Sequence, residues 1–217
     1  LLKSASYDYV FLGAGCASLS LLMRMIKSGK LSDKKILLVD KEPKTKNDRT
    51  WCFWEKQNGF FEKVVYRNWD SISFFSNDYS SDLEIRPYQY KMIKGIDFYN
   101  YCFTEIAKHK NIEILYSEIG ECKLQTDNAV FSFNGQQFSL GRPVVFNSIY
   151  RPTDKAGETI RLLQHFKGWI IETCNPVFNP DKATMMDFRV HQEHGTAFVY
   201  VLPFSETTAL VEYTLFT

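Results

Sequence analysis

The chain has 217 residues, of which 45% are hydrophobic and 24% charged, and its formal net charge is +1. This length and composition fit one large globular domain or two interleaved ones. The near-neutral charge gives no basis for a nucleic-acid partner, and no stretch reaches the ~18 apolar residues that a membrane-spanning helix needs. Five widely spaced cysteines without a Cys-x-x-Cys pair indicate no metal site and no disulfide framework, which favours a reduced, cytoplasmic chain.

A glycine-rich turn between an apolar strand and a helix is the most informative feature. Residues 9–12 are apolar, Gly13 and Gly15 form the turn, and residues 17–26 favour a helix. Gly13 permits the tight turn, Gly15 lets the backbone approach a pyrophosphate, and the helix N-terminus attracts a phosphate. Ser18 stands where the dinucleotide-binding fingerprint has its third glycine, and it is small enough to keep the helix close to the strand.

A second buried strand over residues 35–39 ends at Asp40. An acidic side chain at this position accepts hydrogen bonds from an adenosine ribose in dinucleotide-binding folds. Lys41 and Arg49 lie where a basic side chain could meet the diphosphate or the adenosine edge, although a surface charge is the simpler interpretation of each. The alternative for the whole segment is an ordinary βαβ unit with a glycine turn.

After Asp40 the sequence predicts a loop, one helix and several strands. We expect a loop at 43–48, an aromatic cluster at 50–54, strands at 69–75 and 83–90 around a turn at 76–82, a helix at 95–108, a strand of a parallel sheet at 112–116, and a buried strand at 143–148. Asn134-Gly135 predicts a hairpin between strands at 129–133 and 137–140.

The last third of the chain alternates between apolar and polar residues. Antiparallel strands are expected at 169–172, 184–190, 196–203 and 208–215. Nucleotide-binding βαβ pieces interleaved with an antiparallel sheet are typical of two-domain flavoproteins.

Six segments together resemble the lycopene cyclase family of flavoproteins, which shares its fold with aromatic hydroxylases and geranylgeranyl reductases. They are the turn at 9–18, Thr-Trp-Cys-Phe-Trp at 50–54, the run from Tyr88 to Tyr99, Met-Asp-Phe at 186–188, Phe-Val-Tyr-Val-Leu-Pro-Phe-Ser at 198–205, and Leu-Val-Glu-Tyr-Thr at 210–214. The last of these is similar to the Leu-Glu-Glu-Thr-like catalytic motif of the family. The chain departs from the pattern at Ser18 and at Asn-Ser-Ile 147–149, where many relatives have an Asp-Ser/Gly-Arg run.

The resemblance implies a Rossmann-like FAD/NAD(P)-binding domain interleaved with an antiparallel-sheet substrate domain. The expected pieces are 1–58 and 94–150 for the dinucleotide-binding domain, and 59–93 and 151–217 for the substrate domain. Because family members continue further, we expect this chain to be the N-terminal part of a longer protein whose remainder supplies a second glycine-rich loop and a lid.

The resemblance also implies a chemistry. The substrate would be lycopene or a similar acyclic carotene, and the protein would lie peripherally on a membrane surface from which it takes this substrate. Reduced FAD would stabilise a cationic intermediate, and NAD(P)H would serve only to keep the flavin reduced. Trp51, Phe53 and Trp54 could attract the cation through their ring faces, or form a structural cluster.

Glu212 is the residue that the family motif implies as proton donor. Side-chain alternation places Leu210, Glu212, Thr214 and Phe216 on one strand face, so the acid lies between apolar neighbours. Protonation of an alkene needs a neutral carboxylic acid, and burial keeps a carboxyl neutral by raising its pKa. A solvent-facing strand glutamate is the alternative. Asp187 is a second carboxylate that could orient Glu212 or assist deprotonation, or could be a turn aspartate.

Four functions follow from these patterns. The first is a lycopene β-cyclase-like isomerase that forms rings without net redox change. The second is a flavin-dependent monooxygenase or prenyl reductase of the same fold, which would consume NAD(P)H in proportion to product. The third is a non-catalytic dinucleotide-binding module, and the fourth a carotenoid-binding protein without flavin.

Overall fold

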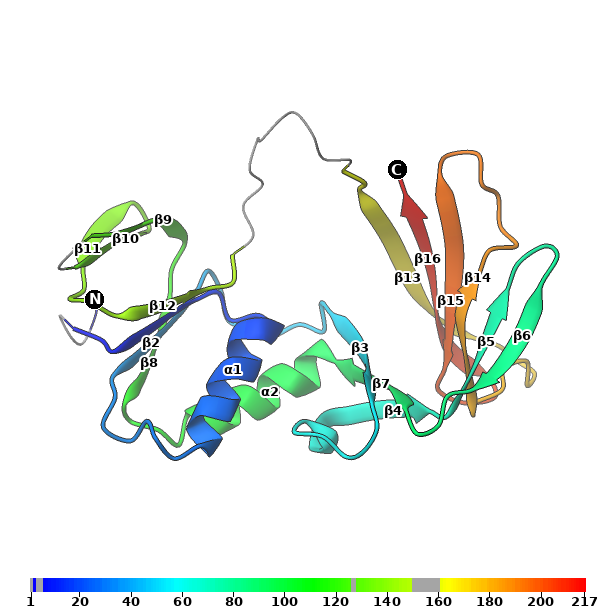
Figure 1. Cartoon of the computed structure of the whole chain (residues 1–217), viewed down its shortest axis with the longest axis horizontal. Coiled ribbons are helices and arrows are strands. Elements are labelled where there is room, and N and C mark those ends of the chain that lie inside the picture. The colour runs from blue at the N-terminus through cyan, green and yellow to red at the C-terminus, as the bar shows by residue number, and fades with distance from the viewer. Residues whose placement is uncertain (1, 3–5, 126–127, 150–160) are drawn as a thin grey trace. The chain divides into compact units, whose positions relative to one another are not determined.

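The computed structural model describes residues 2, 6–125, 128–149 and 161–217, and the chain divides into two compact units (Figure 1). Unit 1 comprises Leu1–Asp48 and Ile96–Asp154, and unit 2 comprises Arg49–Gly95 and Lys155–Thr217. Each unit is therefore built from two separate pieces of the chain. The sequence predicted a domain boundary after residue 58, whereas the first piece of unit 1 ends at Asp48. The reason is that strand β3 (Thr50–Glu55) pairs with β7 (Gln89–Lys94) inside unit 2. The boundary placed after residue 150 lies outside the described residues.

Unit 1 contains a parallel sheet with the strand order β12-β1-β2-β8. Its strands are β1 (Tyr9–Leu12), β2 (Ile36–Asp40), β8 (Ile112–Tyr116) and β12 (Val144–Asn147). Helix α1 (Cys16–Lys27) connects β1 to β2, and α2 (Gly95–Ile106) precedes β8. All five residues of β2 are buried, as is common for strands of a parallel sheet. The predicted βαβ unit and the parallel strand after the second helix are confirmed.

A smaller antiparallel sheet, with the order β11-β10-β9, completes unit 1. Its strands are β9 (Ile119–Leu124), β10 (Ala129–Phe133) and β11 (Gln136–Ser139). Asn134 and Gly135 have φ angles of 47° and 77°, which matches the two positive φ angles of a type I′ hairpin turn. The predicted hairpin is confirmed, whereas the sequence analysis missed β9. Side chains of β10 pack against those of β1 and β2 in one apolar core.

Unit 2 contains a six-stranded sheet and a three-stranded sheet, with the orders β13-β16-β15-β14-β5-β6 and β3-β7-β4. The remaining bounds are β4 (Val65–Trp69), β5 (Ser71–Phe75), β6 (Ser80–Glu84), β13 (Gln164–Glu172), β14 (Lys182–Asp187), β15 (Thr196–Pro203) and β16 (Thr208–Phe216), with a short 3₁₀ helix at Glu62–Val64. The large sheet is antiparallel, as predicted, except that β14 runs parallel to β5. These two strands come from different pieces of the chain, so no hairpin fixes their direction.

Two expected strands of this region were wrong. The segment 69–75 is divided, because β4 ends at Trp69 in the small sheet and β5 begins at Ser71 in the large one. The segment 83–90 is divided as well: the chain turns after β6, where the Tyr88 N–H donates to the Ile85 carbonyl at 2.8 Å, and β7 begins at Gln89. Pro87 lies inside that turn and has no N–H to extend a strand ladder.

The two sheets of unit 2 bury a common core. Trp69, Tyr90 and Met92 of the small sheet pack with Ala183 and Leu202 of the large sheet. The face of the large sheet that carries Leu202 also carries its neighbours two residues along each strand. The core therefore fixes the position of one end of this sheet face, and the residues beyond it form the candidate site.

Lys91 holds the opposite face of the small sheet together. Its side chain is fully buried, and its Nζ lies 2.6 Å from Glu62 Oε2 and 3.2 Å from Glu55 Oε2. Burial alone would lower the pKa of Lys91, but the hydrogen bonds to Glu62 and Glu55 outweigh burial and raise it. Removing one member of such a cluster leaves the other charges uncompensated.

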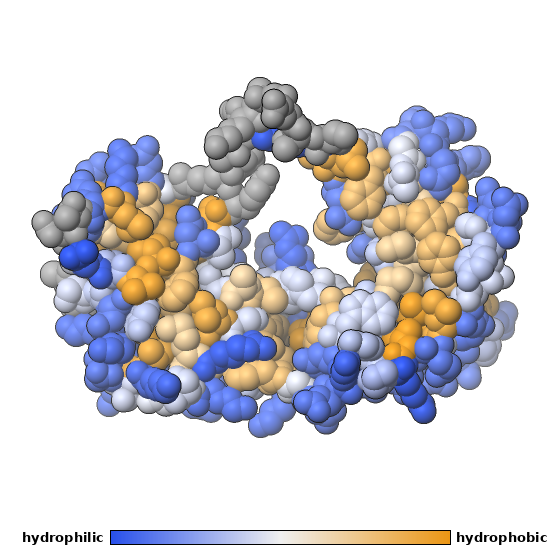
Figure 2. All heavy atoms as spheres, in the orientation of Figure 1, coloured by the Kyte–Doolittle hydropathy of each residue, from blue (hydrophilic) through white to orange (hydrophobic). Residues whose placement is uncertain are grey.

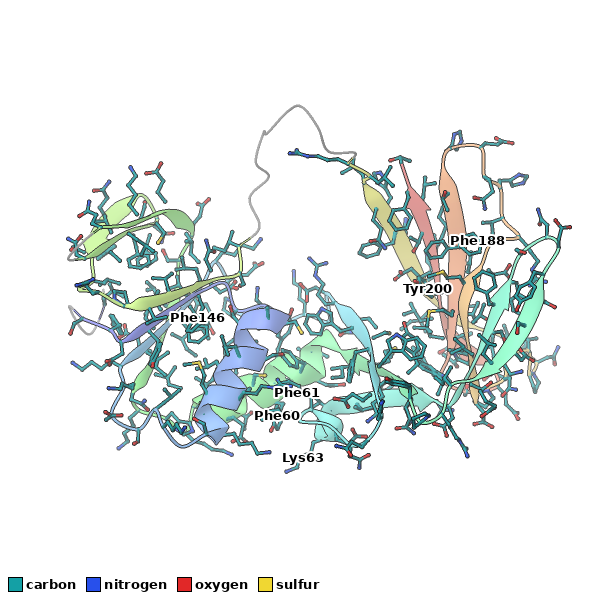
Figure 3. The ribbon with its side chains drawn as sticks, viewed as in Figure 1. Phe60, Phe61, Lys63, Phe146, Phe188 and Tyr200 are labelled. Carbon is teal, nitrogen blue, oxygen red and sulfur yellow. The ribbon has the colours of Figure 1, made fainter. Side chains whose placement is uncertain are left out.

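We expect Lys91→Met to destabilise unit 2 by about 3–5 kcal/mol, because Glu55 and Glu62 would face each other without a cation. Urea unfolding checks this value. Lys63→Met is the matched control, because Lys63 lies beside Glu62 but is exposed (Figure 3). Adding Glu55→Gln and Glu62→Gln to Lys91→Met should recover much of the loss. An equal effect of the Lys63 and Lys91 substitutions would contradict the account.

Candidate functional site

The turn between β1 and α1 requires glycine at its first position. Gly13 has a φ of +92°, and a Cβ added there would lie 2.7 Å from the Ser148 Oγ. The Ser18 hydroxyl donates to the Ser148 Oγ at 2.9 Å, and the Ser148 hydroxyl donates to the Leu12 carbonyl at 3.0 Å. Ser18 thus ties the first turn of α1 to the end of β12. Ser148 was not singled out from the sequence, although it lies in the segment 147–149 that departs from the family pattern.

The second position of the turn is open. A Cβ added to Gly15 would meet no atom within 4 Å. Gly15 is the N-cap of α1, makes no side-chain capping bond, and is followed by no acidic residue in the first helical turn. The first N–H groups of α1 and the positive end of its dipole are therefore available to an anion.

Asp40 closes the other side of this turn. Its Oδ2 accepts from the Ala14 N–H at 2.7 Å, and its Oδ1 accepts from Lys44 Nζ at 2.9 Å and from the Glu42 N–H at 3.2 Å. A carboxylate offers about four lone-pair sites, so one remains for a ribose hydroxyl. An open Gly15, an uncapped helix and a facing Asp40 fit a dinucleotide such as FAD.

The two predicted basic residues differ from the one that the structure brings to Asp40. Lys41 is exposed and pairs with Glu42 at 3.7 Å, and Arg49 is the first residue of unit 2. Lys44 is the basic side chain next to Asp40, and the sequence analysis had assigned it to a loop. Its spacing of four residues from Asp40 was the only available signal.

Glu212 lines a cavity of about 200 Å³ in unit 2. The large sheet contributes Gln164, Tyr200, Leu202, Leu210 and Glu212, and the small sheet contributes Thr50, Cys52 and Tyr90. Tyr200 of β15 and Gly168 of β13 are the cross-strand neighbours of Glu212. None of the described lining residues is lysine, arginine or histidine.

This surrounding changes the acidity of the groups in the cavity. Burial raises the pKa of Glu212, and a long contact from the Thr214 hydroxyl, at 3.5 Å, lowers it by less. Burial also raises the pKa of the Cys52 thiol to about 11. The pKa values of Tyr90 and Tyr200 rise for the same reason, with a further contribution from the Glu212 charge. Glu212 is therefore the strongest acid in the cavity, and burial shifts its equilibrium toward the neutral form.

A row of aromatic rings continues along the sheet face that carries Glu212, and two of its members, Phe188 and Tyr200, are labelled in Figure 3. Phe198 contacts Tyr200 at a centroid distance of 5.3 Å, Phe188 at 5.2 Å and Phe216 at 6.2 Å, and Phe188 contacts Phe74 at 5.5 Å. We call these five residues the aromatic row. Because ring faces attract cations, the row combines an apolar surface with a favourable site for positive charge.

The predicted aromatic candidates lie elsewhere. In β3, Trp54 pairs with Tyr90 and stacks on it at 4.7 Å, so it shares the face of Cys52. Trp51 and Phe53 alternate with Cys52 and so lie on the opposite face, where Phe53 pairs with Lys91. Strand alternation separates the cluster that the sequence presented as one group.

Asp187 is not brought to Glu212. It pairs with Val199, whereas Glu212 pairs with the next residue, Tyr200, so the two carboxylates lie on opposite faces of the sheet. Arg189 binds both Asp187 oxygens, at 2.9 and 2.7 Å, and holds the pKa of this carboxyl below its usual range. The expectation that Asp187 orients Glu212 does not fit this geometry.

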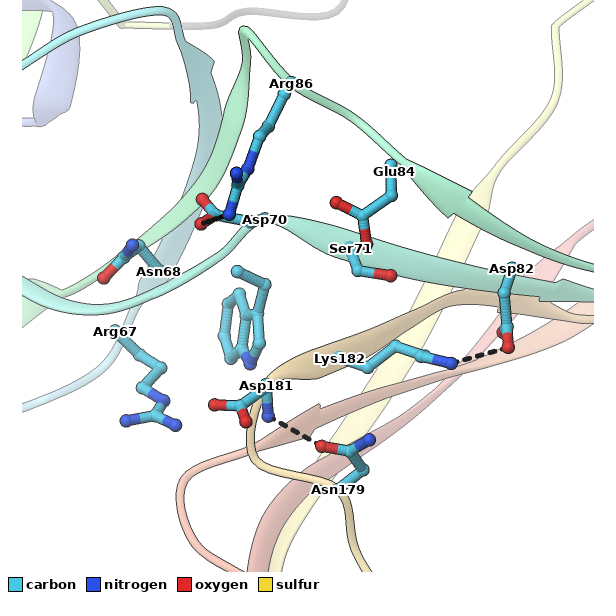
Figure 4. Close-up of a pocket in the computed structure, with 11 residues that line it drawn as sticks. Arg67, Asn68, Asp70, Ser71, Asp82, Glu84, Arg86, Asn179, Asp181 and Lys182 are labelled. Carbon is cyan, nitrogen blue, oxygen red and sulfur yellow. Dashed lines mark hydrogen bonds and ion pairs between the residues drawn. The ribbon is translucent and has the colours of Figure 1, made fainter.

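Unit 2 also has a larger cavity of about 610 Å³ near the start of β5 (Figure 4). Its cations are already paired: Lys182 with Asp82 at 2.6 Å, and Arg86 with Asp70 at 3.4 Å. Arg67 donates to the Pro180 carbonyl at 2.7 Å. Such a lining of internal ion pairs suits a solvated groove and carries no chemistry for an apolar substrate.

Comparison with known proteins assigns the chain to a protein family. A family model described as lycopene cyclase protein matches residues 8–217. The chain belongs to the lycopene cyclase family. Lycopene beta-cyclase of Pantoea ananas is 26% identical over 217 aligned residues, and the match covers 95% of this chain and 51% of that relative. The chain thus spans about half the length of this lycopene cyclase relative.

Solved structures share the fold. A flavoprotein/dehydrogenase from Cytophaga hutchinsonii superposes with a TM-score of 0.66 at 12% identity, covering 97% of this chain and 56% of that one. A geranylgeranyl bacteriochlorophyll reductase-like protein from Thermoplasma acidophilum gives a TM-score of 0.63 at 13% identity, with the same coverage of 97% and 56%. The predicted fold class, a Rossmann-like unit interleaved with a sheet unit, is confirmed. Within the described ranges, no helix of this family member has the length and apolarity to cross a membrane.

We expect Gly15→Val to abolish FAD retention in this protein, because the valine would occupy the space beside the uncapped α1 N-terminus. Bound flavin is measured by its absorbance after desalting. The melting temperature should stay close to that of the wild type, because nothing lies within 4 Å of the added Cβ. Full flavin retention by a folded Gly15→Val variant would contradict the assignment of this turn.

Proposed function

We propose that this lycopene cyclase family member forms ionone rings on lycopene or a similar acyclic carotene, in an acid-catalysed, FAD-dependent and redox-neutral cyclisation. The observation on which the proposal rests is the raised pKa of Glu212 in a cavity without a basic side chain among its described lining residues. Burial raises its pKa, no basic side chain is among the described residues that line its cavity, and the other ionisable lining groups are weaker acids. An alkene is a weak base, so its protonation needs a neutral acid held away from water.

The proposed reaction moves protons only. Glu212 donates its proton to a terminal carbon–carbon double bond of the substrate, and a carbocation forms on the substrate. A neighbouring double bond attacks this cation and closes the ring. A ring carbon then returns a proton to the Glu212 carboxylate, which restores a double bond in the substrate and the neutral acid. The substrate gains one proton and loses one, so substrate and product are isomers.

The residues around Glu212 would stabilise the cation. After proton transfer the Glu212 carboxylate is negative, and the rings of Tyr200 and Phe198 lie on the same sheet face, where their quadrupoles attract positive charge. Reduced FAD would supply further negative charge to the cation, and NAD(P)H would keep the flavin reduced. This use of preorganised charge follows the logic of an oxyanion hole with the sign inverted.

Glu212→Gln keeps the side-chain shape but removes the transferable proton. We expect the rate of ring formation to fall by about 10²–10⁴-fold or more, because loss of a general acid commonly costs this much. The pigments of lycopene-making bacteria that express the protein give the readout, with cyclic product replaced by unchanged lycopene. Flavin content should stay unchanged.

Glu206→Gln is the matched control, because Glu206 is exposed in the turn between β15 and β16. Near wild-type cyclisation by Glu212→Gln would refute the proposed donor. Consumption of NAD(P)H in proportion to product would instead identify an oxidoreductase of the same fold.

We also propose that unit 2 contacts a membrane surface, since an acyclic carotene resides in bilayers. Four side chains at and before β13 are apolar and more than half exposed: Leu162 (63%), Leu163 (66%), Phe166 (61%) and Ile170 (60%). We call these residues the apolar edge. Figure 2 shows apolar residues on the surface of unit 2 where β13 begins. Exposed apolar patches of this kind mark interaction or membrane surfaces.

The double substitution Leu162→Asp and Leu163→Asp should reduce co-flotation of the protein with liposomes several-fold, because two charges would have to enter the interface. Leu124→Asp is the control, because Leu124 of β9 in unit 1 is equally exposed, at 68%. Equal flotation of wild type and the double variant would show that the apolar edge does not contact the membrane.

A further inference from the structure

Lys44 is a largely buried cation in the loop that follows β2. Its side chain is 15% exposed, and its Nζ lies 2.9 Å from Oδ1 of Asp40, whose side chain is 8% exposed. Lysine side chains are rarely this buried unless they are paired. Because a desolvated ion pair contributes little net stability, the position of Lys44 is better explained by what it does to Asp40.

The two oxygens of Asp40 are held by different parts of unit 1. The Glu42 N–H donates to Oδ1 at 3.2 Å and forms an Asx turn, and Lys44 Nζ donates to the same oxygen. Oδ2 accepts from the Ala14 N–H at 2.7 Å, in the turn between β1 and α1. Contacts on both oxygens therefore fix the orientation of the carboxylate, and Lys44 is the one of these three donors that carries a charge.

Asp40 brings a negative charge to a turn that is otherwise suited to an anion. Ala14, whose N–H holds Asp40, lies between Gly13 and Gly15, and Gly15 is the N-cap of α1. The diphosphate of a dinucleotide is negative, and like charges at close range repel each other strongly where water is partly excluded. An unpaired Asp40 would thus oppose binding of the same diphosphate that the α1 N-terminus attracts.

We infer that Lys44 is a positioning residue of the FAD site, which neutralises Asp40 and orients its carboxylate so that the diphosphate and the ribose can bind together. This inference rests on the FAD dependence in the proposed function and deepens it. Lys44 acts through Asp40 and need not touch the cofactor. Its role therefore differs from the direct contact that the sequence suggested for Lys41 and Arg49.

The first test measures the dissociation constant of FAD by calorimetry, with this protein after removal of its flavin. Lys44→Met should weaken FAD binding by about 10-fold or more, because a hydrogen bond to a charged group typically contributes at least this factor to an equilibrium constant. Lys44→Arg should recover most of the affinity, because it keeps the charge. Unchanged affinity in a folded Lys44→Met variant overturns the inference.

Lys41→Met is the matched control, because it removes the same charge from the same loop. The Lys41 side chain is 72% exposed and lies 3.7 Å from Glu42, and such exposed pairs contribute little. We expect its FAD affinity to stay within about 2-fold of wild type. Equal losses in Lys41→Met and Lys44→Met would show that only the overall charge of the loop matters, and would overturn the inference.

The second test separates charge neutralisation from a merely structural role. Between about 0.01 and 1 M salt the Debye length falls from ~30 to ~3 Å, so the loss caused by Lys44→Met should shrink as salt screens Asp40 from the diphosphate. In an Asp40→Asn background, Lys44→Met should cause almost no further loss, and this double variant also leaves no charge unpaired if Lys44→Met alone folds poorly. A loss that is independent of salt and equally large beside Asn overturns the inference. A protein that shows the expected FAD binding but forms no rings refutes the proposed function instead and leaves the role of Lys44 intact.

Discussion

The account depends on the desolvation of one carboxyl group. A carboxyl that must stay protonated can tolerate neither water nor a nearby cation, because both favour its charged form. The cavity at Glu212 favours the neutral form through the partial burial of the carboxyl among apolar and aromatic neighbours, and through the lack of a basic side chain among its described lining residues. The same sheet shows the contrary case. Asp187 lies on the opposite face, pairs with Arg189, and is held in its charged form.

The cavity exists because of how unit 2 packs. Tyr90 and Met92 of the small sheet are fixed in a core with Leu202 of the large sheet, and Cys52 pairs with Met92 in the next strand. Cys52 and Tyr90 are thereby held over the sheet face that carries Glu212. Lys91 fixes the other face of the same strand through its two carboxylate partners. Stability and site geometry thus share one element, β7.

The turn between β1 and α1, where a dinucleotide would bind, depends on small residues that leave space for other groups. Gly13 admits the Ser148 hydroxyl, Ser18 reaches that hydroxyl from α1, and Gly15 leaves the space beside the helix N-terminus empty. The serine in place of the third glycine is therefore compatible with the fold, because its hydroxyl gains a partner at the end of β12.

Local patterns predicted the local structure well. The glycine turn, the buried strand before Asp40 and the Asn134-Gly135 hairpin each depend on residues close in sequence, and each is present. What the sequence could not show depends on register between distant strands. The parallel pairing of β14 with β5, the division of segment 69–75, the opposite faces of Glu212 and Asp187, and the pairing of Glu212 with Gly168 all require the ladder itself. The aromatic row was visible only as separate phenylalanines and tyrosines.

The central claim is that Glu212 is a neutral acid, and its titration tests this most directly. The carboxyl of Glu212 is followed by infrared difference spectroscopy of its protonated C=O stretch, with Glu212→Gln used to assign the band. The account predicts a pKa above the ordinary glutamate value of 4.5, with the protonated band persisting as the pH rises past that value. A Glu212 that titrates at or below 4.5, like an exposed glutamate, would contradict the account.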